Sequence, residues 1–191
     1  MKRFFTIFIF LLSLQNISSA DSISDYEVAG LKLGKSIIEV MSIEEIIDNL
    51  VQRSDDERYM TIKYVPDKSI YSNLDFKEYY VTIDMINDEL KIVSFTGMEW
   101  MPNNFKGCIE KQNKYANKFE KIFKIKKEIH PIKDFSDKYG PGSKWRAIIF
   151  EYPIKANTAS VLCYHYGDSP EENNLKVSVL TREYADSISV R

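Results

Sequence analysis

The chain has 191 residues, of which 28% are charged and 44% hydrophobic, with 26 lysines and arginines against 28 aspartates and glutamates. This slightly acidic balance argues against a nucleic-acid partner, because nucleic-acid-binding domains are usually basic. The chain has only two histidines and two cysteines. Because a zinc site needs three or four suitably spaced ligands, we expect neither a metal nor another cofactor.

Residues 1–20 resemble a secretory signal peptide. Lys2 and Arg3 precede an apolar run from Phe4 to Leu14, and small residues follow up to Ala20. A run of about a dozen residues is too short for a membrane-spanning helix of about 20 residues. We therefore expect cleavage after Ala20 and a periplasmic or secreted protein, with peripheral membrane contact at most. The alternative is an anchor that is never cleaved.

Residues 21–191 suit a single domain of about 170 residues. A short extended segment leads to two capping-box patterns, Ser36-x-x-Glu39 and Ser42-x-x-Glu45. Apolar residues at helical spacing then predict a short amphipathic helix, preceded by a helical turn from Ile37. The residues of this stripe are Ile43, Ile46, Ile47, Leu50 and Val51.

Strand and helix patterns alternate along the rest of the chain. Short β-rich runs bounded by turn residues predict two groups of three strands. A second helix, with apolar residues at helical spacing, is expected from about 102 to about 127, ended by His130-Pro131. The predicted strands span 59–65, 78–85 and 90–95, the last two forming a hairpin around Asn87-Asp88, and then 145–152, 160–166 and 175–181.

This order predicts an α+β fold, in which the strands form an antiparallel sheet with the helices on one face. Six strands are expected in the sheet. The order of elements also suggests a tandem helix-plus-three-strand repeat, with halves at 21–101 and 102–191.

The two cysteines predict a disulfide, because an even number of cysteines in an exported chain favours pairing. Cys108 falls on the inward stripe of the second helix, and Cys163 lies in a β-rich run. A helix packed on a sheet would bring them together. Two buried free thiols are the alternative.

The segment Ala29-Gly-Leu-Lys-Leu-Gly-Lys-Ser36, which runs into Glu39-Val and Glu44-Glu-Ile-Ile, is similar to the opening of the SmpA-type outer-membrane-assembly lipoproteins and of β-lactamase inhibitor proteins. The resemblance covers about 30 residues. It implies an α+β domain that binds proteins and has no enzymatic activity. The chain lacks the lipidated cysteine of the lipoproteins.

The sequence holds few patterns typical of catalysis. Gly34-Lys35-Ser36 resembles the end of a phosphate-binding loop, but Ala29 stands where that motif needs glycine. His130 is expected at a helix end and His165 on a strand, partly buried. No Gly-x-Ser-x-Gly motif is present. A serine nucleophile could still meet His165 in space, so a small exported hydrolase remains the alternative function.

The second helix carries more lysines than acidic residues, although the chain as a whole is acidic. A cluster of methionine and tryptophan lies just before this helix, and such residues are enriched in binding surfaces. Simple solvation of the lysines and core packing of the aromatic residues are the alternatives. The candidate binding patch consists of Met98, Trp100, Met101, Lys111, Lys114 and Lys118.

The leading hypothesis is an exported, non-catalytic interaction domain that binds a protein partner. A structural or envelope-stress protein without a dedicated ligand is a third possibility. The sequence does not indicate the oligomeric state.

Overall fold

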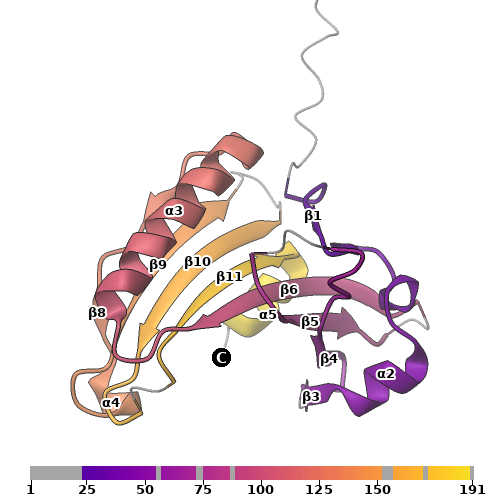
Figure 1. Ribbon diagram of the computed structural model, residues 1–191, viewed down its shortest axis with the longest axis horizontal. Coiled ribbons are helices and arrows are strands. Elements are labelled where there is room, and N and C mark those ends of the chain that lie inside the picture. Colours follow the sequence, from indigo (N-terminus) through magenta and orange to yellow (C-terminus); the bar gives the residue numbers. More distant parts are fainter. Residues whose placement is uncertain are drawn as a thin grey trace, which may run out of the picture.

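The computed structural model describes residues 23–54, 57–71, 75–86, 89–151, 157–169 and 172–189. The predicted signal peptide and the turn expected at Asn87-Asp88 lie outside these residues. Figure 1 shows a strongly curved sheet with one long helix lying across it.

The sheet is antiparallel and has nine strands within the described part of the chain. Two three-stranded meanders, β4-β5-β6 and β9-β10-β11, join where β6 pairs with β11. Short strands extend both edges. The strands are β3 Leu50–Arg53, β4 Tyr59–Tyr64, β5 Tyr79–Asp84, β6 Lys91–Trp100, β7 Glu128–Ile129, β8 Lys133–Asp134, β9 Lys144–Glu151, β10 Thr158–His165 and β11 Asn174–Leu180.

The α+β class and the antiparallel sheet predicted from the sequence are confirmed. All six predicted strands are present, and β5 and β6 form the expected hairpin. The predicted number of six strands was too low, because β3, β7 and β8 also join the sheet. These three strands have two to four residues each, which is too short for an alternating pattern to reveal them.

The core lies on one face of the sheet. A row of directly paired residues crosses five strands on this face, and all are buried. The row consists of Val81, Phe95, Val179, Ala159 and Phe150. A hairpin of β1 (Glu27–Val28) and β2 (Leu31–Lys32), followed by the 3-10 turn η2 (Ile37–Glu39), adds buried Leu31 and Ile37 to the same core.

Helix α3 (Phe105–Phe123) packs on this core face, mainly against β10, β11 and β9. It begins at Asn104, whose side chain accepts a hydrogen bond from the Gly107 N–H at 2.9 Å. Its buried residues recur at the predicted spacing. The predicted disulfide is present, joining buried Cys108 to buried Cys163 with 5.9 Å between their Cα atoms.

The predicted extent of α3 was wrong at its C-terminal end. The helix stops at Phe123 because Lys124 adopts a left-handed conformation with φ of 55°. Residues 125–127 have no regular secondary structure and lead into β7, so His130 follows a strand rather than a helix. Its N–H donates to the Ala147 carbonyl of β9 at 3.0 Å.

The predicted first helix was too long. α2 (Ile43–Asp48) has the expected capping box between Ser42 and Glu45, but Leu50 to Arg53 pair with β4 as β3. Within the predicted stripe, Ile46 alone is buried. A helix of this length gains little stability by itself, and the edge of β4 offers the next residues backbone hydrogen bonds. The Ser36 side chain does not cap η2.

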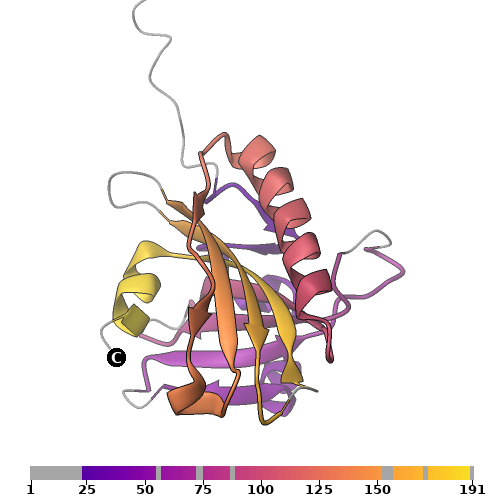
Figure 2. The same ribbon diagram turned by 90° about the vertical axis from the view of Figure 1, so that its left-hand side faces the viewer.

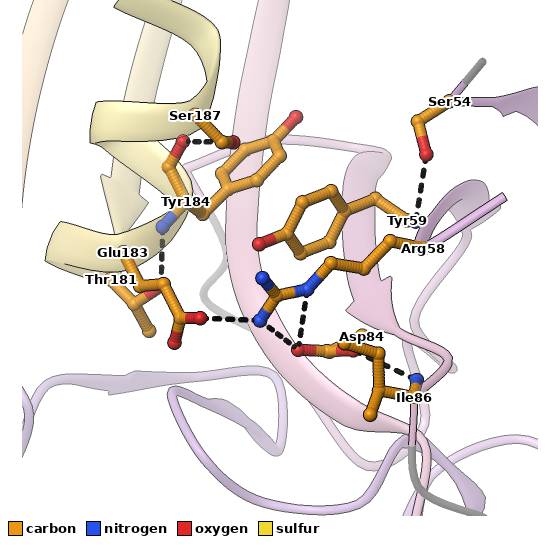
Figure 3. Close-up of polar contacts among 9 residues, drawn as sticks. All are labelled: Ser54, Arg58, Tyr59, Asp84, Ile86, Thr181, Glu183, Tyr184 and Ser187. Carbon is orange, nitrogen blue, oxygen red and sulfur yellow. Dashed lines mark hydrogen bonds and ion pairs between the residues drawn. The ribbon is translucent and has the colours of Figure 1, made fainter. Parts of the chain in front are cut away.

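A C-terminal helix that the sequence did not predict, α5 (Arg182–Ser189), contacts the opposite face of the sheet from α3 (Figure 2), so the prediction that the helices lie on one face is not confirmed. In Figure 2 the sheet separates α3 on the right from α5 on the left. Figure 3 shows how α5 is attached to the sheet: Arg58 Nη2 contacts Asp84 at 2.9 Å and Glu183 of α5 at 2.5 Å. The rings of Tyr59 and Tyr184 also meet edge to face, 4.9 Å between centroids.

Candidate functional site

A cavity of about 740 Å³ lies between α3, the end of β6 and the segment that leads into β5. Residues 75–78 form one wall, Met98 to Trp100 of β6 a second, and a row of α3 side chains a third. These helical residues are Lys111, Lys114, Tyr115 and Lys118. The volume is within the range of about 300–1,000 Å³ that is typical of ligand pockets.

The rotation of α3 on the sheet determines which of its side chains face the cavity. Cys108 is held to β10 by the disulfide, and Gln112, one helical turn later, is completely buried. The Gln112 amide donates to the carbonyls of Arg146 and Val161 at 2.9 and 2.7 Å and accepts from the Arg146 guanidinium at 2.9 Å. With these two positions fixed, residues at 111, 114, 115 and 118 project from the side of the helix.

The apolar part of the cavity is built on a glycine. A Cβ atom at Gly97 of β6 would lie 2.3 Å from the ring of Phe76, so only glycine allows this ring to lie against the strand. Phe76 stacks on Tyr115 of α3, with 5.4 Å between the ring centroids and 22° between their planes. Trp100, which is 51% exposed, adds a large aromatic surface at the rim.

The acidic residues that line the cavity are all neutralised by lysines. Asp75 pairs with Lys118 at 2.6 Å, and Glu99 pairs with Lys111. Glu78 pairs at 2.6 Å with Lys63 of β4, which is outside the cavity. Exposed pairs of this kind contribute about 0–1 kcal/mol each, so their main effect is on local charge and on side-chain orientation.

Two lysines of the lining are not used in these pairs. Among the described residues, neither Lys77 nor Lys114 has a hydrogen-bond or ion-pair partner, and both are exposed. Burial, and then the negative charges of Asp75 and Glu99, raise the pKa of Tyr115, so its hydroxyl stays neutral. The cavity therefore combines aromatic walls with an excess of positive charge.

Five of the six residues of the predicted binding patch line this one cavity: Met98, Trp100, Lys111, Lys114 and Lys118. The structure corrects the prediction for Met101, which is 7% exposed and packs in the core. Its N–H donates to the Asn173 carbonyl at 2.7 Å, one position beyond the last pair of β6 with β11.

The wall at residues 75–78 was not predicted. The sequence analysis began a strand at Glu78 and assigned no structure to residues 75–77. Their proximity to α3 arises because the β5-β6 hairpin brings Tyr79 opposite Gly97. Tyr115 was also missed. Its position four residues after Lys111 was an available signal, because side chains four apart share a helix face.

The surroundings of the two histidines do not match a catalytic pair. His165 Nδ1 lies 2.9 Å from the amide nitrogen of Asn173, and its ring contacts Phe105. Burial, followed by the positive charge of Lys144, lowers the pKa of His165. His130 Nε2 lies 3.5 Å from Glu128.

The glycine-containing turn that resembles part of a phosphate-binding loop is attached to the hairpin instead. The Gly34 N–H donates to the Ile92 carbonyl at 2.8 Å, and the Ser36 hydroxyl donates to the Glu89 carbonyl at 2.5 Å. The described residues contain no cluster of three or more histidine, cysteine, aspartate or glutamate side chains able to hold a metal ion. In the same part of the chain, no helix has both the length and the apolar character needed to cross a bilayer.

A comparison of the chain with protein-family models, with curated proteins and with solved structures finds no match. The geometry of the cavity is therefore the basis for assigning a function.

Proposed function

We propose that this chain is an exported, non-catalytic interaction domain and that its binding site is the cavity between α3, β6 and residues 75–78. The observation that carries the proposal is the convergence of Met98, Trp100 and three lysines of α3 on one cavity of suitable volume. Tryptophan, tyrosine and methionine supply much of the binding energy in protein interfaces, and all three line this cavity.

Export is the second part of the proposal. The leader at residues 1–20 supports it, and so does the disulfide, because disulfides persist mainly in oxidising compartments. A periplasmic or secreted location follows from this reasoning. The repeat of element order in halves 21–101 and 102–191 and the resemblance to the SmpA-type and β-lactamase inhibitor proteins remain hypotheses that fit a binding role.

The alternative function, a small exported hydrolase, has less support. The hydrogen-bond partner of His165 Nδ1 is the Asn173 amide rather than a hydroxyl or carboxylate. A base that activates serine needs that hydroxyl within hydrogen-bond reach.

Site-specific photocrosslinking in the organism that produces the chain tests the binding site. A photoreactive amino acid replaces Lys114 in the full chain, and a matched variant carries it at Lys106, an exposed lysine of α3 outside the cavity. We expect adducts from position 114, not from position 106, and their loss when Trp100→Ala is added. Equal adducts from both positions, or substrate turnover by the purified protein without any adduct, would contradict the proposal.

A further inference from the structure

The cavity lies beside an edge of the sheet that has no neighbouring strand. β5 begins at Tyr79, which pairs with Gly97 of β6. Beyond this point, residues 98–100 of β6 pair with β11 on one side, and within the described residues no strand lies on the other side. These same three residues form a wall of the cavity.

The free edge exposes the main-chain hydrogen-bonding groups of Trp100 on the side of β6 away from β11. In an antiparallel pair, successive residues direct their N–H and C=O groups to opposite sides of the strand. Met101 donates to Asn173 across the β6-β11 pair, and Val93 accepts from Thr181 across the same pair. The register between these points is unbroken. The main-chain groups of Trp100 therefore face away from β11, and no described residue pairs with them.

We infer that the occupant of this cavity is an extended, acidic peptide segment of a partner protein that adds as a strand to the free edge of β6, an inference that rests on the proposed function. An unpaired strand edge is a template for another strand, and main-chain hydrogen bonds of this kind give affinity for peptides of many sequences. A lipid or another small amphiphile could fill the aromatic part of the cavity, but its acyl chain could not pair with the main-chain N–H and C=O of Trp100.

The side chains of the cavity define the sequence that such a segment would carry. Alternate residues of an added strand point to the same face of the sheet. One apolar side chain would enter between Phe76, Tyr115 and Trp100, and the residue two positions away would point toward α3. There Lys114 lacks an acidic partner among the described residues. Lys77, on the facing wall, also lacks an acidic partner among them. The expected motif is therefore an apolar residue, any residue, and then aspartate or glutamate, in either direction.

Selection from a displayed library of random peptides, each about twelve residues long, tests the inference with the disulfide-intact full chain as bait. We expect the enriched peptides to share the apolar–x–acidic motif. Lys114→Gln should weaken the best synthetic peptide about fivefold, and Lys114→Glu should reverse the preference toward basic peptides. Lys106→Gln is the matched control and should change nothing. Urea unfolding of each variant checks that the fold is intact.

N-methylation of the selected peptide, one amide at a time, distinguishes strand addition from other modes of binding. Every second amide of an added strand faces the strand that it pairs with. Methylation of an amide that faces β6 should therefore weaken binding about tenfold, and methylation of an amide that faces away should not. Equal effects at both kinds of amide, or no enriched peptide, would overturn the inference. If laurate binds instead and Trp100→Ala weakens its binding, the cavity is a binding site but its ligand is not a peptide. If the crosslinks at position 114 also fail, the proposed function is wrong as well.

Discussion

Reduction of the Cys108–Cys163 disulfide should destabilise the protein by about 4 kcal/mol. The bridge closes a loop with a sequence separation of 55 residues. In the chain-entropy model, a loop of this size restricts the unfolded chain by about 14 cal/mol/K, which is about 4 kcal/mol at 25 °C. Since a domain of this size is stable by only about 5–15 kcal/mol, the effect is a large part of the total.

The structure also predicts a local effect of reduction. The disulfide and Gln112 together fix the rotation of α3, and this rotation places Lys111 and Lys114 on the cavity wall. Reduction should therefore weaken ligand binding even at temperatures where the chain stays folded. Binding of the selected peptide to the oxidised and the reduced protein, well below the melting temperature, measures this effect.

Urea unfolding of the oxidised and reduced wild-type chain, followed by circular dichroism, gives the stability difference without changing any core atom other than the bridge. A thiol assay on the native protein provides the control and should find no free thiol. A difference below about 1 kcal/mol would refute the entropic argument. Two free thiols in the native protein would refute the bridge itself.

Three further predictions concern other parts of the fold. Gly97→Ala should destabilise the protein by about 1–3 kcal/mol, measured by urea unfolding, because the new Cβ overlaps the ring of Phe76; unchanged stability would contradict this packing. Burial tends to raise the pKa of Asp84, but hydrogen bonds, chiefly from Arg58, outweigh it and lower the pKa. The Asp84 carboxylate therefore stabilises the fold above about pH 4, and this contribution is lost as the pH falls through the lowered pKa that Asp84 has in the folded protein. In the Asp84→Asn variant, the free energy of unfolding should therefore fall less steeply as the pH is lowered. Burial lowers the pKa of Lys176; NMR of dimethylated lysines should find it titrating below the others.

The elements that the sequence predicts well are those whose own residues carry a clear period. β4 alternates buried and less buried side chains from Met60 onward, and the stripe of α3 runs without interruption through Cys108, Gln112 and Phe119. The buried apolar side chains of these elements belong to one core. The strand and helix patterns were therefore sufficient to place them.

The elements that the sequence predicts poorly are stabilised by partners distant along the chain. β3 forms because the edge of β4 accepts it, although its residues continue a helical stripe. α5 is attached through contacts of Glu183 with Arg58 and of Tyr184 with Tyr59, more than a hundred residues earlier. Lys124 ends α3 by its backbone conformation rather than by a glycine, which is the usual signal.

The candidate site shows the same division. The lysines of α3 were identified because they depart from the acidic average of the chain, and Trp100 because tryptophan is enriched in binding surfaces. The opposing wall at residues 75–78 depends on where β5 begins opposite Gly97. The free edge of β6 has the same origin, since it exists only because β5 is shorter than β6.

The most direct test of the account is a two-dimensional NMR titration of the isotope-labelled, disulfide-intact chain with the peptide selected on it. The account predicts that the largest shifts fall on residues 75–78, on residues 98–100 and on the cavity side of α3, and that the amide of Trp100 becomes protected from exchange. Shifts concentrated instead on α5, or on the face of the sheet that α5 contacts, would contradict the claim that this cavity is the binding site.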